Sequence, residues 1–306
     1  MAKETAAAMG KNRSTETRPV PPPLGPSRMP GRRAHPRGWG PALVLMLVLA
    51  LVLPALFLAG CGVQGEGDRL AAQARALWEA GVYGDAARNF VTLADLYPNS
   101  PLAEESLYLA ASLYHHYIRD SEQAARLYQN LAVSFPKGQY FFEARENLAM
   151  VYEDSDHSRH RALQIYQQLL LAPKMAGRAD YLRFKIGELN LQLGKMDQAR
   201  LEFRDLLIKR PNSKFAPKTY YLVGYSYYLE KRFNLALAVF RGTARKFPGT
   251  PIAIRAEFFV ADTLEDQGKM KLALKSFLAL KNRYPFPDII KRRIRTLRAR
   301  IRRGVR

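Results

Sequence analysis

Hydrophobic positions recur along most of this chain with a period of 37 or 38 residues. In each period an alanine is followed four residues later by Phe or Tyr, and a proline comes eleven or twelve residues after the alanine. The six sets are Ala86/Phe90/Pro98, Ala124/Tyr128/Pro136, Ala162/Tyr166/Pro173, Ala199/Phe203/Pro211, Ala236/Phe240/Pro248 and Ala273/Phe277/Pro285. A fixed period of this length is typical of arrays of stacked helical repeats.

Each period predicts two antiparallel helices joined by a tight turn. In the second helix the alanine and the aromatic residue lie one turn apart on the same face. A leucine three residues further on extends this apolar stripe in five of the six units, and Thr243 takes its place in the fifth unit. The proline lacks an N–H and clashes with the preceding turn, so it ends the second helix.

Two further positions of the period predict how the helices pack and begin. A small residue stands twelve positions before the alanine in five units, which predicts close approach of the paired helices. Met150 occupies this position in the third unit and predicts looser packing there. Ser100, Ser213 and Thr250 lie where the N-cap of the following helix is expected.

The pattern predicts an all-α fold, a superhelix of about six helix-turn-helix repeats followed by a basic C-terminal helix. Its small, alanine, aromatic and proline positions resemble those of the tetratricopeptide repeat (TPR). The longer period and the Pro-x-Ser/Thr-x-x-Ala junctions more narrowly resemble the BamD (YfiO) family of outer-membrane assembly lipoproteins and the periplasmic CpoB (YbgF) relatives. The chain departs from the BamD family in having more units and a strongly basic tail.

The resemblance to BamD proteins implies a role and a partner. It implies a periplasmic scaffold in the complex that folds β-barrel proteins into the outer membrane. The scaffold would bind the periplasmic domains of the barrel component of that complex.

The composition divides the chain into four segments. We expect a disordered N-terminus and a lipoprotein signal peptide in residues 1–60, a lipidated linker in 61–67, the six repeats in 68–286 and a basic amphipathic helix in 287–306. A start at Met29 in place of Met1 would give the signal an ordinary length.

The segment before the repeats predicts export. Basic residues precede the apolar run Ala42–Leu58, which contains eight leucines and ends three residues before Cys61, the only cysteine. An uncleaved transmembrane helix is the alternative, although Pro54 within the run weakens it.

The ending Leu-Ala-Gly-Cys resembles the lipobox of bacterial lipoproteins. This resemblance implies cleavage before Cys61 and acylation of its sulfur. In many Gram-negative bacteria an Asp after this cysteine retains a lipoprotein in the inner membrane, so Gly62 favours the periplasmic face of the outer membrane.

The net charge of +21 is concentrated at the two ends of the chain. Residues 1–60 carry +6 and residues 281–306 carry +10, which leaves +5 for the 220 residues between them. The basic character therefore does not indicate a nucleic-acid-binding core, and we expect no nucleic-acid partner.

Tyrosines crowd the first helix of the fifth unit and are candidates for partner binding. First helices line the concave face of TPR arrays, and exposed tyrosine is a common interface anchor. The candidates are Tyr220, Tyr221, Tyr225 and Tyr228. Packing between repeats is the alternative for each of them.

The C-terminal segment Ile289–Arg303 predicts an amphipathic helix, because its apolar residues are spaced four, three and four apart. The apolar face would cover the open end of the last repeat. The basic face, which includes Arg292 and Arg295, would contact an acidic partner domain or an anionic lipid surface.

No arrangement of residues predicts catalysis. The chain has no glycine-rich phosphate loop, nucleophile elbow or HExxH motif, so we expect no enzyme and no cofactor. His157 and His160 lie three residues apart in an acidic segment, but a solvated polar turn explains them better than a metal site does. We expect no metal.

Two other functional classes remain open on sequence grounds. One is another TPR lipoprotein, such as a secretin pilotin or a cell-envelope coordination factor. The other is a membrane-anchored peptidoglycan-lytic enzyme or its regulator, and the absence of paired catalytic acids argues against the enzyme.

Overall fold

The structure is a computed structural model in which residues 65–304 are described. Cys61 and the predicted signal segment lie outside the described residues. Within the described range the chain forms helices joined by short loops and contains no β-strand. The prediction of an all-α fold is confirmed.

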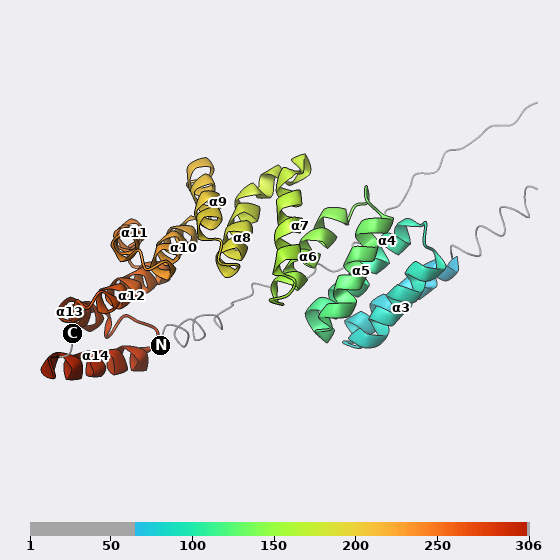
Figure 1. Cartoon of the computed structure of the whole chain (residues 1–306). Coiled ribbons are helices and arrows are strands. Elements are labelled where there is room, and N and C mark those ends of the chain that lie inside the picture. Colours follow the sequence, from blue (N-terminus) through green and yellow to red (C-terminus); the bar gives the residue numbers. More distant parts are fainter. Residues whose placement is uncertain (1–64, 305–306) are drawn as a thin grey trace, which may run out of the picture. The chain divides into compact units, whose positions relative to one another are not determined.

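The helices form six successive pairs, which we call units 1 to 6, and one further helix (Figure 1). The pairs are residues 65–79 with α3 (Tyr83–Leu96), α4 (Pro101–Leu113) with α5 (Ser121–Ser134), α6 (Phe141–Glu153) with α7 (Arg159–Leu171), α8 (Ala179–Gln192) with α9 (Met196–Lys209), α10 (Ala216–Leu229) with α11 (Phe233–Lys246), and α12 (Pro251–Asp266) with α13 (Met270–Leu280), and α14 (Pro287–Arg302) follows them.

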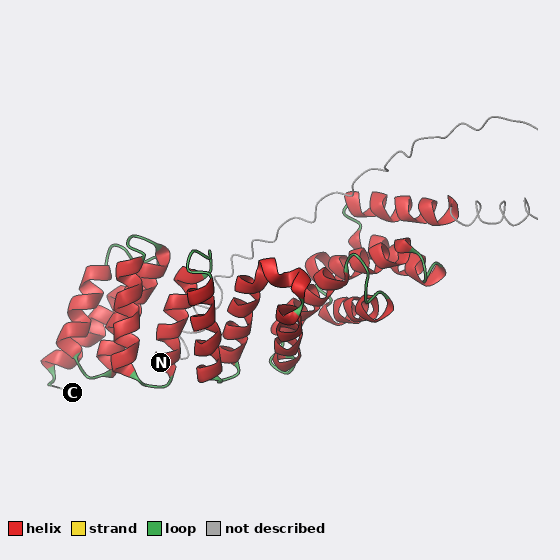
Figure 2. Ribbon diagram, turned by 90° about the horizontal axis from the view of Figure 1, so that it is seen from above, coloured by secondary structure: helices red, strands yellow, loops and turns green. Residues whose placement is uncertain are grey.

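Each helix packs beside its neighbours in sequence. First helices of adjacent units also meet, as α8 does with α10 and α10 with α12. A short π-helix, Tyr114–Ile118, continues α4, and a 3₁₀-helix, Pro173–Arg178, precedes α8. Figure 2 shows the loops, in green, at the two ends of the helices. This alternation is the predicted helix-turn-helix array.

The repeating apolar stripe forms the core of the array. All six alanines of the pattern are 0% exposed, and the six aromatic residues are at most 1% exposed. Thr243 is also fully buried, and its hydroxyl donates a hydrogen bond of 2.9 Å to the carbonyl of Val239 one turn earlier. The threonine therefore fills the place of a leucine without leaving a polar group unpaired.

A small residue on the first helix of a unit makes room for the aromatic ring of the second. A Cβ added at Gly187 would lie 2.2 Å from the Phe203 ring, and one added at Gly224 would lie 2.8 Å from the Phe240 ring. In unit 2 the small residue is Ser112, whose hydroxyl lies 3.1 Å from the Tyr128 hydroxyl. The small residue therefore sets the distance between the paired helices.

In unit 3 the small residue lies one position earlier than the period predicts, and looser packing at Met150 stays a prediction. Ala149, one position before Met150, is 0% exposed and shares a core cluster with Ala162 and Tyr166, while Met150 is half-buried. The turn 154–158 between α6 and α7 is longer than the turns 80–82 and 193–195 of units 1 and 4. Because this turn is longer, the small residue that shares the core with Tyr166 lies nearer the N-terminus of α6 than the period predicts.

Two of the three expected N-caps are present. The hydroxyls of Ser100 and Thr250 each accept a hydrogen bond from the backbone N–H three residues later. Ser213 is not the cap of α10, which begins at Ala216. Its hydroxyl instead donates a 2.5 Å hydrogen bond to Asp180 of α8, so it ties one unit to the next.

We expect Gly187→Ala to destabilise the protein and Gly242→Ala to stabilise it. Both glycines lie within helices, but a Cβ at Gly242 would meet no atom within 4 Å, whereas one at Gly187 would overlap the Phe203 ring. Overpacking should cost about 1–3 kcal/mol at Gly187. The better helix former should add up to about 1 kcal/mol at Gly242. Urea unfolding followed by circular dichroism measures both changes, and equal effects would contradict the assigned packing.

Candidate functional site

Tyr221 and Tyr228, two of the candidate binding residues, are buried between α10, α11 and α12. Tyr221 is 5% exposed and Tyr228 is 9% exposed. Both rings pack against Phe259 of α12, with centroids 5.6 Å and 5.4 Å away. The structure therefore corrects the interpretation of these two tyrosines as partner-binding residues, because they fill the space between units.

Tyr220 and Tyr225 keep part of their surface exposed. Lys246 of α11 donates a 2.7 Å hydrogen bond to the Tyr220 hydroxyl and lies 4.3 Å from the ring centroid. Tyr225 packs edge-on against Phe259, at 5.4 Å between centroids. Partner binding stays a prediction for this pair of tyrosines.

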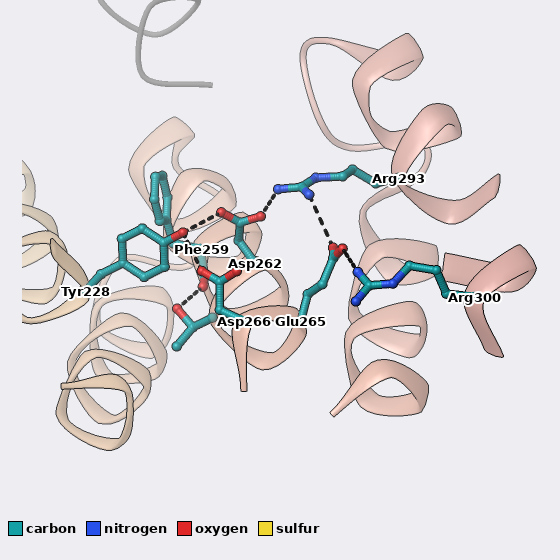
Figure 3. A network of polar contacts seen from close by, with 8 residues as sticks. Tyr228, Phe259, Asp262, Glu265, Asp266, Arg293 and Arg300 are labelled. Carbon is teal, nitrogen blue, oxygen red and sulfur yellow. Dashed lines mark hydrogen bonds and ion pairs between the residues drawn. The ribbon is translucent and has the colours of Figure 1, made fainter. Parts of the chain in front are cut away.

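Tyr228, on α10, is one member of a buried polar network that continues onto α12 (Figure 3). Its single hydroxyl proton is shared between Asp266, at 2.7 Å, and Asp262, at 3.0 Å. Burial raises the pKa of Tyr228, and the two neighbouring carboxylates raise it further. Asp262 is 4% exposed, and burial raises the pKa of this carboxyl while Arg293 opposes the shift.

Arginines of α14 complete the network. Arg293 pairs with Asp262 and, at 3.3 Å, with Glu265, and Arg300 pairs with Glu265 at 3.0 Å (Figure 3). Glu265 is 9% exposed. Buried carboxylates are costly unless they are paired, so α14 supplies the cations that the end of unit 6 needs.

The apolar face of α14 is buried against the array. Ile290 and Leu297 are 0% exposed and Ile294 is 7% exposed, and α14 lies against α13. This stripe is therefore not available to enter a lipid bilayer.

The outer side of α14 is strongly basic. Its exposed cations include Arg292 and Arg295, the two candidate binding residues, together with Lys291, Arg298 and Arg302. Among the described residues, an ion pair joins only Lys291 of these five to an acid, Asp288, at 3.2 Å.

A shallow groove of about 430 Å³ runs between α13 and α14, and we call it the C-terminal groove. It is lined by Leu278, Lys281, Lys291, Ile294, Arg295, Arg298, Ala299 and Arg302. Leu278 is 41% exposed, so the groove combines an open apolar side chain with five cations. Carboxylates of a bound segment could pair with the arginines, which favour two-point contacts with such groups.

The histidines do not form a metal site within residues 65–304. No group of three or more His, Cys, Asp or Glu lies close enough there to hold an ion. His157 and His160 are exposed. His115 stacks on His116 in the π-helix at 4.3 Å between ring centroids, and burial, followed by the charge of His116, lowers the pKa of His115 to about 4. His115 is therefore neutral at pH 7.

Membrane attachment cannot come from the described helices crossing a bilayer. None of the helices in residues 65–304 is both long and apolar enough to do so.

Sequence comparison identifies the repeat. Residues 105–138 and 181–213, in units 2 and 4, match the tetratricopeptide repeat family. No curated protein matches the chain.

Several solved structures share the fold. A tetratricopeptide repeat protein from Parabacteroides merdae is 16% identical with a TM-score of 0.56, over 78% of this chain and 87% of that one. The C-terminal part of a TPR repeat-containing protein from Cytophaga hutchinsonii is 19% identical with a TM-score of 0.52, over 69% and 78%. The apo form of RapI is 12% identical with a TM-score of 0.50, over 77% and 75%. At these identities the likeness shows the fold alone. Arrays of this fold present extended surfaces that can bind other proteins.

We expect Arg293→Gln to loosen α14 and lower the free energy of unfolding by about 3 kcal/mol, because it leaves the buried Asp262 carboxylate without a cation and Glu265 with Arg300 alone. The loss should grow with pH. A carboxyl whose folded-state pKa is raised contributes stability at low pH, and that contribution is lost as the pH rises through the raised pKa. Removing the cation raises this pKa further.

Urea unfolding at pH 5 and pH 8, with hydrogen exchange across residues 287–302, measures this effect. Arg292→Gln is the matched control, since Arg292 is exposed on the same helix. A control as unstable as Arg293→Gln would contradict the role assigned to the buried network.

Proposed function

We propose that this chain is a lipid-anchored scaffold on the periplasmic face of a Gram-negative outer membrane, where it binds other envelope proteins during the assembly of β-barrel proteins. The observation that carries the scaffold role is the C-terminal groove, an open basic surface at the end of a TPR-type array. The assembly role rests on the resemblance of the repeats to BamD proteins.

The C-terminal groove supports a protein partner with acidic residues and an apolar side chain. Four of its five cations lie on α14, which packs against α13, and the fifth, Lys281, directly follows α13, so they hold fixed positions that can select the register of a bound segment. Leu278 offers the apolar contact that adds affinity to a charged interface. The resemblance of the repeats to BamD proteins suggests the periplasmic domains of the barrel component as this partner.

The half-buried tyrosines of α10 would extend the contact surface. Tyr220 and Tyr225 belong to the first helix of unit 5, on the part of the array next to α12. We assign them a supporting role, because each is already partly held by Lys246 or Phe259.

The anchor is assigned to Cys61 on sequence grounds. The Leu-Ala-Gly-Cys ending places the only cysteine of the chain directly after an apolar run. Two or three acyl chains on that residue would hold the protein stably, since a single chain gives only marginal binding.

We expect Cys61→Ser to abolish lipid incorporation and to leave a chain that keeps its signal segment or becomes soluble. Labelled palmitate incorporation and the gel mobility of the processed chain measure this in a Gram-negative host. Unchanged processing and unchanged membrane attachment would mean that the segment 42–58 is a plain transmembrane helix.

The partner is tested by isolating the tagged, full-length protein from detergent extracts. We expect the barrel-assembly protein to co-purify, and we expect Arg295→Glu with Arg298→Glu to reduce its recovery at least tenfold, about 1.4 kcal/mol or more, by reversing two charges of the groove. Arg204→Glu with Arg241→Glu is the matched control, because both cations are exposed on second helices, α9 and α11, that do not line the groove.

The two parts of the proposal can fail separately. Recovery of only peptidoglycan-linked or pilus components would contradict the assembly role. Equal loss of the partner in both charge-reversal variants would contradict the assignment of the groove.

A further inference from the structure

Four aliphatic side chains are more exposed than any other large hydrophobic side chain of residues 65–304. They are Leu96 at 57%, Val133 at 75%, Leu171 at 83% and Ile208 at 70%. Each lies in the last turn of the second helix of its unit, two or three residues before the proline of the repeat. Val133, Leu171 and Ile208 each stand nine residues after the repeat alanine and Leu96 ten residues after it. Exposed aliphatic residues that recur at the same end of successive helices indicate an interaction surface.

These four residues lie on one edge of the array, which we call the junction edge. It is formed by the loops that join one unit to the next and the last unit to α14, namely residues 97–100, 135–140, 172–178, 210–215, 247–250 and 281–286. The opposite edge, which we call the hairpin edge, is formed by the loops within units, namely residues 80–82, 119–120, 154–158, 193–195, 230–232 and 267–269.

The two edges differ in charge. The junction loops carry seven exposed Lys and Arg and no acid: Lys137, Lys174, Arg178, Arg210, Lys214, Lys281 and Arg283. The hairpin loops carry five cations and four acids, so their net charge is only +1. In unit 5 the last turn of the second helix carries Arg245 and Lys246 where units 1–4 have an exposed aliphatic residue.

Some acids adjoin the junction edge, but they do not cancel its charge. The acids exposed in the neighbouring helical turns are Glu66, Asp68, Asp95, Glu143 and Asp288, and Asp288 pairs with Lys291. The same turns carry exposed Lys209, Lys218, Arg245 and Lys246, so the edge is basic from unit 2 onward, whereas its end at unit 1 bears only acids. Two of the junction cations, Arg178 and Arg283, pair with Glu146 and Glu257.

The chain enters the array at the junction edge. A Cβ at Gly67 would lie 3.2 Å from the ring of Tyr97 and 3.6 Å from Leu102, so the first helix begins beside the loop 97–100 (Figure 1). Cys61 precedes the first described residue, Gly65, by four residues. Four residues span at most about 14 Å, so a lipid on Cys61 would hold this edge close to the membrane.

We propose that the junction edge of units 1–4 lies on the anionic surface of the membrane that holds the anchor. This inference rests on the proposed acylation of Cys61. The aliphatic side chains of Leu96, Val133, Leu171 and Ile208 enter the interfacial layer, and the loop cations lie at the phosphate groups. Aliphatic residues bordered by Lys and Arg are the combination that such surfaces bind.

A lipid surface accounts for this edge better than a protein partner does. The cations are distributed over several loops instead of forming a pocket, and the edge bears no acid in those loops that would select a partner's arginines. The short connection to Cys61 also leaves little room for a folded domain between the edge of unit 1 and the membrane.

The test places a fluorescent label at one introduced cysteine in the full-length chain, with Cys61 blocked by its lipid. The label goes on Val133→Cys at the junction edge or, as the matched control, on Leu229→Cys, an exposed leucine at the hairpin edge. The lipidated protein is placed in vesicles of phosphatidylethanolamine and phosphatidylglycerol with brominated acyl chains. Flotation of the vesicles reports anchoring, and fluorescence quenching reports contact with lipid.

We expect both proteins to float and the label at residue 133 to be quenched several-fold more than the label at residue 229. The difference should shrink when phosphatidylcholine replaces the anionic lipid, because the loop cations then lose their partners. Flotation with equal quenching at both positions, or with no quenching at residue 133, would overturn the inference. The four exposed aliphatic side chains would then be assigned to a protein partner. Failure to float would overturn the acylation of Cys61, and with it this inference.

Discussion

The contact between a small residue on one helix and an aromatic ring on its partner is the constraint on which the rest of the array depends. The rings of Phe203 and Phe240 occupy space that a Cβ at Gly187 or Gly224 would invade. Helices that approach this closely bury the alanine and leucine positions on either side completely. Because the contact recurs in successive units, the loops, caps and exposed side chains recur at fixed places as well, and a surface property of one unit becomes a property of a whole edge.

The last unit of such an array has one face that no further unit covers. The residues on that face explain the role of α14. The first helix of unit 6 carries Asp262 and Glu265 on a face that another unit would otherwise cover. Here α14 buries Ile290 and Leu297 as it packs against α13, and it neutralises the acids of α12 with Arg293 and Arg300. The remaining cations of α14 are not needed for this packing, so they are available for binding. One helix thus closes the core and presents the most basic surface of the described chain.

The period of the sequence was sufficient to predict the fold, the buried alanines and the buried aromatic residues, because these positions repeat with the helix. It could not separate Tyr221 and Tyr228, which are buried, from Tyr220 and Tyr225, which are partly exposed, since all four lie on α10. Phe259 on the next unit contacts Tyr225 as well, so burial depends on what else surrounds each ring. Tyr221 also packs on Phe240 of α11, and the Tyr228 hydroxyl meets Asp262 and Asp266 of α12. A position along one helix does not show what a neighbouring unit places against it.

The acidic network of α12 also escaped sequence analysis, although its signal is visible in retrospect. Asp262, Glu265 and Asp266 are spaced three and four apart, and Arg293 and Arg300 are spaced by seven on α14, beside its apolar stripe. Such spacings are ordinary on solvated helices, so they acquire meaning only once the two helices are known to meet. The same is true of Ser213, whose partner Asp180 belongs to the preceding unit.

The placement of one exposed aliphatic side chain in each of units 1–4 has a consequence for how such a protein can change in evolution. Duplication of an internal unit would lengthen the array by one helix pair without disturbing the core, because every unit contacts mainly its neighbours. The added unit would carry its own aliphatic residue to the same edge. The number of exposed aliphatic residues on that edge would therefore rise by one with each duplicated unit. A point substitution would change only the residue of a single unit.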